Sequence, residues 1–184
     1  MGKRSNFERV ERDFYPTPRE AVFPLLPHLS PATAFAEPCA GDGALIRILD
    51  SLGHACVWAS DIEPKQDGIV PIDALLIPSI AADCIITNPP WDRKILHPMI
   101  EHLSSMLPTW LLFDADWPHT RQSAELIKRC SKIVAIGRVK WIPGSLHVGK
   151  DNCCWYLFEP RYTEGPRFYG RSTFPPTSTP EINT

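Results

Sequence analysis

The stretch TAFAEPCAGDG, residues 33–43, decides how the rest of the chain is interpreted. Its first part, Thr33 to Glu37, is short and mostly apolar, as expected of a buried strand. Two glycines follow in the segment Glu37 to Gly43, and a helical pattern begins at Ala44. A strand, a glycine turn and a helix in this order are typical of an open α/β sheet, which binds ligands at the carboxyl ends of its strands.

The remaining sequence alternates short apolar runs with stretches of helical period. The predicted strands are Thr33 to Glu37, Ala55 to Ser60, Asp83 to Thr87, Thr109 to Asp114, Lys132 to Val139 and Cys153 to Phe158, with a weaker strand ending at Ile72. The predicted helices are 44–52, 93–107 and 119–130. Because no helix separates the last two strands, we expect them to be antiparallel neighbours. The pattern predicts an α/β fold with a Rossmann-like, doubly wound, mostly parallel seven-stranded sheet and an antiparallel last strand.

Length and composition limit the organisation of the chain. Its 184 residues, 43% of them hydrophobic, suffice for one well-buried core. We expect one folded domain over residues 1–160 and a loosely ordered, proline-rich tail over residues 161–184. A formal net charge of −2 does not by itself indicate a nucleic-acid-binding protein. No apolar run is long enough to span a membrane and no signal-peptide core is present, so we expect a soluble cytoplasmic protein without membrane partners.

Cysteine and histidine do not predict a metal site. The six cysteines contain no Cys-x-x-Cys pair, and four of them lie in apolar runs, so we interpret them as reduced core thiols. The spacing of His97, His102 and His119 matches no ligand set, and we assign these side chains to helix surfaces and caps.

The glycine loop and the acids after it indicate a nucleoside ligand. A dinucleotide-binding loop would have a third glycine where Ile46 stands, so the ligand is expected to lack a pyrophosphate. Asp61 ends the second predicted strand about 20 residues after the loop, where an acid can accept the hydroxyl protons of a ribose. The alternatives are a tight strand-to-helix turn and a surface acid. Asp73 could contact an adenine amino group, or it could cap a helix.

The most informative stretch is Asn88-Pro89-Pro90-Trp91, which follows the most apolar strand and so lies at the same sheet edge as the glycine loop. The side-chain oxygen of Asn88 and the carbonyl of Pro89 can each accept one N–H of an aromatic amine, which favours a tetrahedral nitrogen and stabilises its developing positive charge. Pro90 stiffens the turn, and Trp91 offers a face to a planar base removed from its stack. The alternative is a proline-rich turn with a buried Trp.

Together these motifs resemble the class I S-adenosylmethionine-dependent methyltransferases, and in particular small phage- or prophage-type adenine-specific DNA methyltransferases. Tyr15-Pro16-Thr17-Pro18 resembles the upstream cofactor motif of that family, and Asn88 to Trp91 resembles its Asp/Asn-Pro-Pro-aromatic motif. The resemblance implies the class I methyltransferase fold, a catalytic domain over 1–160, and transfer of a methyl group from S-adenosylmethionine to the N6 amino group of adenine in DNA, in the cytosol of a bacterium or a phage-infected host. It places the cofactor against Tyr15, Thr17, Pro18, Glu37, Pro38, Cys39, Ala40, Gly41, Gly43, Asp61, Ile62, Asp73, Ala74 and Asn88.

The acceptor is less closely defined than the reaction. Asn88 stands where many adenine DNA enzymes carry Asp, and its motif is shared with methyltransferases of RNA bases and of protein glutamine amides. A catalytically silent, cofactor-binding partner subunit is a further alternative. There is no room for an appended target-recognition domain, so we expect substrate contacts from loops, namely from Trp91, Arg93, Lys94, Asp116, Trp117, Arg138, Lys140, Trp141, His147 and Lys150.

Overall fold

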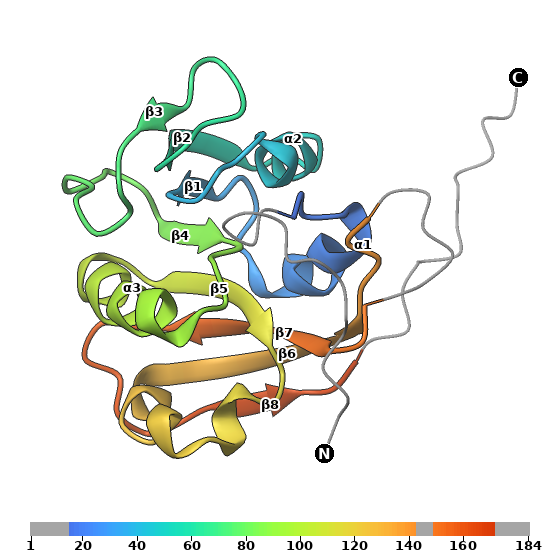
Figure 1. Cartoon of the computed structure of the whole chain (residues 1–184), viewed down its shortest axis with the longest axis vertical. Coiled ribbons are helices and arrows are strands. Elements are labelled where there is room, and N and C mark those ends of the chain that lie inside the picture. The colour runs from blue at the N-terminus through green and yellow to red at the C-terminus, as the bar shows by residue number, and fades with distance from the viewer. Residues whose placement is uncertain (1–14, 143–148, 172–184) are drawn as a thin grey trace, which may run out of the picture.

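The structure is a computed structural model that describes residues 15–142 and 149–171. Within these ranges one sheet contains eight strands in the order β3-β2-β1-β4-β5-β7-β6-β8 (Figure 1). The strands are β1 Ala34–Glu37, β2 Ala55–Asp61, β3 Val70–Pro71, β4 Cys84–Thr87, β5 Thr109–Asp114, β6 Cys130–Arg138, β7 Asn152–Phe158 and β8 Arg167–Tyr169. Every strand predicted from the apolar runs is present, with bounds shifted by two residues or fewer.

The strand directions confirm the predicted α/β architecture. β3, β2, β1, β4 and β5 are parallel to one another, whereas β7 is antiparallel to both β5 and β6. The sheet has eight strands rather than the predicted seven, because β8 pairs in parallel with β6. β8 falls in the segment expected to be a loose tail, and residues 172–184 lie outside the described residues. Three residues flanked by one proline and one glycine gave too short a pattern to predict a strand.

Two of the three predicted helices are confirmed. α2 spans Ala44–Asp50 and α3 spans Arg93–Met106, where the Asp92 side chain caps the helix by accepting the backbone N–H of Lys94. A helix and a 3-10 segment were not predicted. They are α1, Arg19–Val22, and η2, Phe23–His28, whose prolines at 24 and 27 obscure the helical pattern.

The helix predicted over 119–130 is wrong. Three short 3-10 turns replace it, η3 Trp117–His119, η4 Arg121–Ser123 and η5 Leu126–Arg129. Thr120 has an extended backbone (φ −92°, ψ 149°), and the Ser123 hydroxyl donates to the carbonyls of Pro118 and Thr120. Side-chain bonds of this kind compete with the helical ladder, which explains why an apolar period did not produce a helix.

The described residues form two hydrophobic cores. Helices lie on both faces of the sheet (Figure 1). α1, η2 and α2 cover one face through Val22, Leu25, Leu45 and Leu49, and α3 covers the other through Met99 and Leu103. Helices on both faces leave the ends of the strands as the open part of the domain. No helix among the described residues is long and apolar enough to cross a membrane.

Candidate active site at the carboxyl edge of the sheet

The pairing of β1 with β4 brings the two main sequence motifs to one edge. Phe35 is in register with Cys84 and Ala36 with Ile85, and the two strands are parallel. The glycine loop after β1 and the Asn88 turn after β4 therefore leave the sheet side by side, as the sequence predicts.

The glycine loop needs glycine at both of its predicted positions. Gly41 and Gly43 have φ values of 53° and 74°, in the left-handed region that side chains disfavour. Gly43 is also the N-cap of α2. The backbone N–H of Ala40 donates to the carbonyl of Ser60 at 2.9 Å, which holds the loop against the end of β2.

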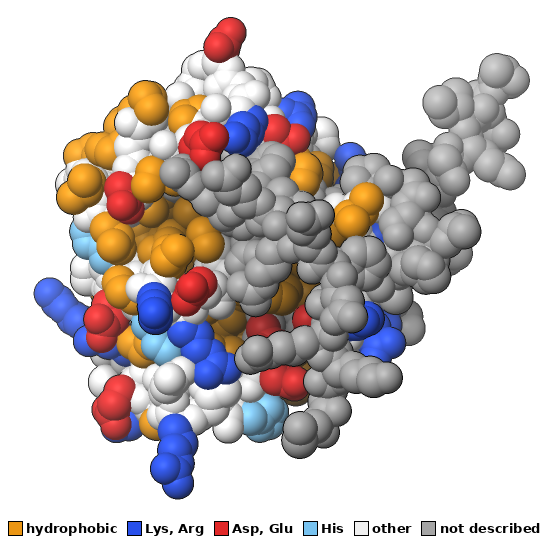
Figure 2. Space-filling view, viewed as in Figure 1, with side chains coloured by type: hydrophobic (Ala, Val, Ile, Leu, Met, Phe, Trp, Pro, Cys, Tyr) orange, Lys and Arg blue, Asp and Glu red, His pale blue; other side chains and the backbone are white. Residues whose placement is uncertain are grey.

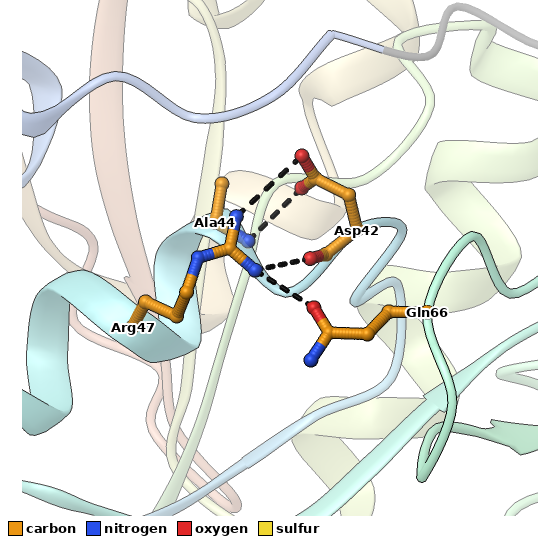
Figure 3. Close-up of polar contacts among 4 residues, drawn as sticks. All are labelled: Asp42, Ala44, Arg47 and Gln66. Atoms are coloured by element: carbon orange, nitrogen blue, oxygen red, sulfur yellow. Dashed lines mark hydrogen bonds and ion pairs between the residues drawn. The ribbon is translucent and has the colours of Figure 1, made fainter.

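A polar cluster of Asp42, Arg47 and Gln66 joins the glycine loop to α2 and to the β2–β3 loop (Figure 3). The Arg47 guanidinium donates to the backbone carbonyl of Asp42 and to Oε1 of Gln66 at 2.8 Å, and it lies 3.6 Å from the Asp42 carboxylate. Asp42 Oδ1 in turn accepts the N–H of Ala44 at 3.0 Å. Sequence reasoning missed Arg47 and Gln66, because only the fold brings the β2–β3 loop against the first turn of α2.

Asp61 links the end of β2 to the glycine loop. Its Oδ2 accepts the backbone N–H of Gly41 at 2.8 Å, and its Oδ1 accepts that of Glu63 at 2.8 Å. A carboxylate oxygen has two lone pairs, so each oxygen can still accept a hydroxyl proton. The next side chain, Ile62, is 60% exposed and offers an apolar surface beside the carboxylate.

Glu37 is a buried acid at the end of β1. It is 1% exposed, and its Oε2 has no hydrogen-bond partner among the described residues. Burial, followed by the negative charges of Asp61 and Asp42, raises the pKa of Glu37 well above its ordinary value. A buried carboxyl group with a free oxygen is suited to a cationic ligand, which would compensate its charge.

Asp73 lies in the segment after β3. Burial, and then the charges of Asp61, Glu37 and Asp73, raise the pKa of the Cys39 thiol, which lies beside the Thr87 hydroxyl. The Asp73 Oδ1 accepts the N–H of Leu75 at 2.9 Å and caps a turn. The helix-capping alternative is wrong, because no helix follows Asp73.

Asn88 is held in a defined orientation by the segment before α1. Its Nδ2 donates to the backbone carbonyl of Tyr15 at 3.4 Å and to the Thr17 hydroxyl at 3.2 Å. A carbonyl oxygen can only accept, so the NH₂ group of Asn88 must point toward Tyr15. Its Oδ1 is thereby left as an acceptor at the start of the Asn-Pro-Pro-Trp turn.

Three aromatic residues gather around this turn. The Trp91 indole N–H donates to the carbonyl of Leu112 at 3.2 Å, which fixes the ring. Trp141 meets Trp91 edge-on with ring centroids 5.8 Å apart, and Tyr15 lies 6.4 Å from Trp141. The sequence predicted site roles for all three residues but not their contact with one another.

Comparisons with known proteins identify the fold. No family model and no curated protein matches the sequence. A candidate RNA methyltransferase from Pyrococcus horikoshii is 19% identical with a TM-score of 0.59, over 84% of this chain and 91% of that one. A candidate class I S-adenosylmethionine-dependent methyltransferase from Listeria monocytogenes is 12% identical with a TM-score of 0.51, over 84% and 62%. The chain has the class I methyltransferase fold. The M protein of the type I restriction enzyme EcoKI matches it too, at 14% identity and a TM-score of 0.52, over 88% of this chain and 49% of that one.

In this class I methyltransferase fold the β6–β7 loop is joined to α1. Glu20 Oε1 accepts the backbone N–H of Lys140 at 2.9 Å. Gly149 donates its N–H to the carbonyl of Val139 at 2.8 Å, and a Cβ at Gly149 would lie 3.1 Å from Cδ1 of Trp141. Glu20 and Gly149 carry no motif that the sequence could have revealed.

The predicted basic residues of this loop lie at the expected edge. β6 runs parallel to β5, because both are antiparallel to β7, so Arg138 at its carboxyl end is on the side of Asn88. Arg138, Lys140 and Lys150 are exposed, and His147 lies outside the described residues. On the face shown in Figure 2, Lys and Arg are interspersed with Asp and Glu rather than gathered in one basic patch.

The residues after β4 and β5 that were predicted to contact the substrate differ in exposure. Arg93 donates to Gln122 Oε1 at 2.8 Å, and Arg93, Lys94 and Asp116 are all exposed. Trp117 is 1% exposed and packs in the core against Phe113, so its prediction as a substrate contact is wrong. Its apolar bulk was buried by the 3-10 turn that replaced the predicted helix.

The cysteines are free thiols, four of them buried and two half-buried. Among residues 15–142 and 149–171, no group of three or more His, Cys, Asp or Glu side chains is arranged to hold a metal ion.

Proposed function

We propose that this protein is an S-adenosylmethionine-dependent methyltransferase that methylates the exocyclic N6 amino group of adenine in DNA. The orientation of Asn88 carries the proposal. Its NH₂ group is used by Tyr15 and Thr17, so its Oδ1, with the carbonyl of Pro89, can receive the two hydrogens of an amino group. A turn that served only structure would not require an acceptor that no donor among the described residues occupies, at the edge where the fold binds ligands.

The residues around the glycine loop fit the cofactor. The Oε2 of Glu37, which has no partner within residues 15–142 and 149–171, offers a counter-charge to the cationic methionine end. Asp61 retains lone pairs for the ribose hydroxyls, and the exposed Ile62 can lie against the adenine ring. Tyr15 and Thr17 close the other side, because they are bonded to Asn88. No third glycine is needed, since this ligand has no pyrophosphate.

When bound, S-adenosylmethionine would supply a methyl carbon activated by a sulfonium. Asn88 Oδ1 and the Pro89 carbonyl accept the N–H groups and direct the nitrogen lone pair at that carbon. A nitrogen–carbon bond forms as the carbon–sulfur bond breaks, and the sulfur keeps the electron pair. The extra proton of the methylated nitrogen leaves to solvent, so these residues need not act as a general base.

An unstacked base fits the surroundings of Asn88. Trp91, Tyr15 and Trp141 provide aromatic surfaces within one cluster, and base–aromatic stacking favours a base removed from its helix. Arg138, Lys140 and Lys150, exposed at the same edge, suit a phosphate backbone. The similarity to the EcoKI M protein supports this assignment.

An RNA base is the second candidate acceptor. The structural match to the candidate RNA methyltransferase from Pyrococcus horikoshii covers 91% of that chain. That protein therefore consists of little more than a domain like this one. Both acceptors would place the enzyme in the cytoplasm.

The test is methyl transfer from labelled S-adenosylmethionine to unmethylated DNA, to RNA and to a protein extract, followed by nucleoside digestion and mass spectrometry. N6-methyladenine in DNA that is absent with Asn88→Ala supports the proposal. If an RNA base or a glutamine amide is labelled instead, that group and not DNA is the acceptor. Cofactor binding without transfer to any of the three would identify a silent partner subunit.

A further inference from the structure

The segment of residues 15–22 contacts both halves of the candidate site. At one end, Tyr15 accepts the amide of Asn88, within the proposed cofactor and catalytic residues. At the other end, Glu20 accepts the backbone N–H of Lys140, in the β6–β7 loop that carries the proposed acceptor contacts. Six residues of chain therefore connect two parts of the site that are far apart in the sequence.

The 15–22 segment is firmly attached to the sheet directly after Glu20. The indole N–H of Trp155, on β7, donates to the carbonyl of Ala21 at 2.8 Å. Trp155, Ala21 and Val22 are each 0% exposed. A short segment anchored in the core transmits a displacement of one end to the other, because close-packed side chains do not absorb it.

Glu20 is placed to act on Trp141 through the backbone. It bonds the N–H of the residue just before Trp141, and a hydrogen bond to an ionised carboxylate is stronger than a neutral one. Trp141 in turn contacts Tyr15 and Trp91. The bond therefore restrains a ring that touches both the 15–22 segment and the catalytic turn.

We propose that the 15–22 segment couples cofactor binding to acceptor binding, and that Glu20 is the positioning residue that holds the Lys140–Trp141 backbone for this purpose. The inference rests on the proposed function. A cofactor that orders Tyr15 and Thr17 orders Glu20 with them, and the acceptor then meets Lys140 and Trp141 already in place. Coupling of two ligands is reciprocal, so the acceptor must tighten cofactor binding by the same factor.

The experiment measures binding of a fluorescent, adenine-containing DNA oligonucleotide by anisotropy, with and without saturating S-adenosylhomocysteine. Cofactor-product affinity is measured separately by calorimetry. Four proteins are compared: the unaltered chain, Glu20→Ala, Glu20→Gln and Glu125→Ala. Gln keeps an oxygen that can accept the Lys140 N–H, and Glu125→Ala removes a different exposed glutamate, whose side chain pairs with Lys128.

In the unaltered chain we expect S-adenosylhomocysteine to tighten oligonucleotide binding by about tenfold. Glu20→Ala should reduce that gain to less than about twofold while its affinity for S-adenosylhomocysteine alone stays within about twofold, and Glu20→Gln should retain most of the gain. A gain preserved in Glu20→Ala overturns the proposal, as does a gain lost equally in Glu125→Ala or absent from the unaltered chain. If the unaltered chain does not bind S-adenosylhomocysteine at all, the proposed function itself fails, which is a separate result.

Discussion

The side-chain amide of Asn88 donates to the backbone carbonyl of Tyr15, 73 residues earlier in the chain. This bond, with the one to Thr17, decides which end of the amide faces the ligand site. Asn is required for this arrangement, because an Asp carboxylate could accept at both oxygens but could not donate to Tyr15. The segment that precedes α1 therefore explains why Asn rather than Asp stands at position 88.

Asn88→Ala should lower kcat by roughly 10²- to 10³-fold, since it removes a hydrogen-bond acceptor that stabilises developing charge. Cofactor affinity should fall only a few-fold. Asn88→Asp keeps acceptor oxygens but places one against the Tyr15 carbonyl, so it should retain more transfer than Ala and bind the cofactor less tightly. Single-turnover methyl transfer and calorimetry measure the two effects. An Ala variant with unaltered kcat would remove Asn88 from the mechanism.

Glu37→Gln should stabilise the free protein and weaken cofactor binding. Burial, Asp61 and Asp42 raise the pKa of Glu37, so its contribution to stability is full below its unfolded pKa and is lost as pH rises through the folded pKa. Removing the ionisable group should raise the free energy of unfolding by about 1 kcal/mol near neutral pH, which corresponds to an increase of roughly 2–4 °C in Tm.

Glu37→Gln should also change how the affinity for S-adenosylmethionine depends on pH. A cationic ligand is bound by the ionised form of Glu37, so affinity for S-adenosylmethionine should increase as pH rises through the folded pKa, with release of one proton. Calorimetry in buffers of different ionisation enthalpy measures that proton. The Gln variant should bind S-adenosylmethionine weakly and release no proton. Equal proton release by both proteins would show that the proton comes from another group.

His97 should make the stability of the fold depend on pH. Its Nε2 accepts the indole N–H of Trp117 at 3.0 Å, which requires the neutral imidazole. Burial, and then the charge of Arg93, lower its pKa. Because this pKa is lowered, the stability that His97 contributes is present above the ordinary histidine pKa of about 6.5. It is lost as pH falls through the pKa of His97 in the folded protein.

The matched control is His97→Gln, because an amide oxygen can accept from Trp117 without titrating. Denaturant unfolding between about pH 8 and about pH 5 should show a steeper loss of stability for the unaltered chain than for the Gln variant. Parallel curves for the two proteins would show that other groups cause the loss.

The parts of this molecule that the sequence predicts are those encoded by local pattern. β4 and β5 are apolar runs of the right length, and a glycine turn between a strand and a helix has few structural interpretations. The bond between Glu20 and Lys140 joins residues 120 positions apart, and no local signal encodes a pairing that only the packing of α1 beside the β6–β7 loop creates. Trp117 illustrates the same limit, since a Trp suits both a core and a binding surface, and packing decided between them.

Gly149→Ala should impair acceptor binding by displacing Trp141. A Cβ at this position would lie 3.0 Å from the carbonyl oxygen of Val139 and 3.1 Å from Cδ1 of Trp141. The carbonyl belongs to the backbone, so the indole ring is the part that can move. Because Trp141 contacts Tyr15 and Trp91, we expect acceptor KM to rise several-fold, cofactor affinity to change little, and tryptophan fluorescence to shift. Gly170→Ala is the control, because a Cβ there meets nothing within 4 Å. An unchanged acceptor KM in Gly149→Ala would show that the position of Trp141 does not govern the acceptor.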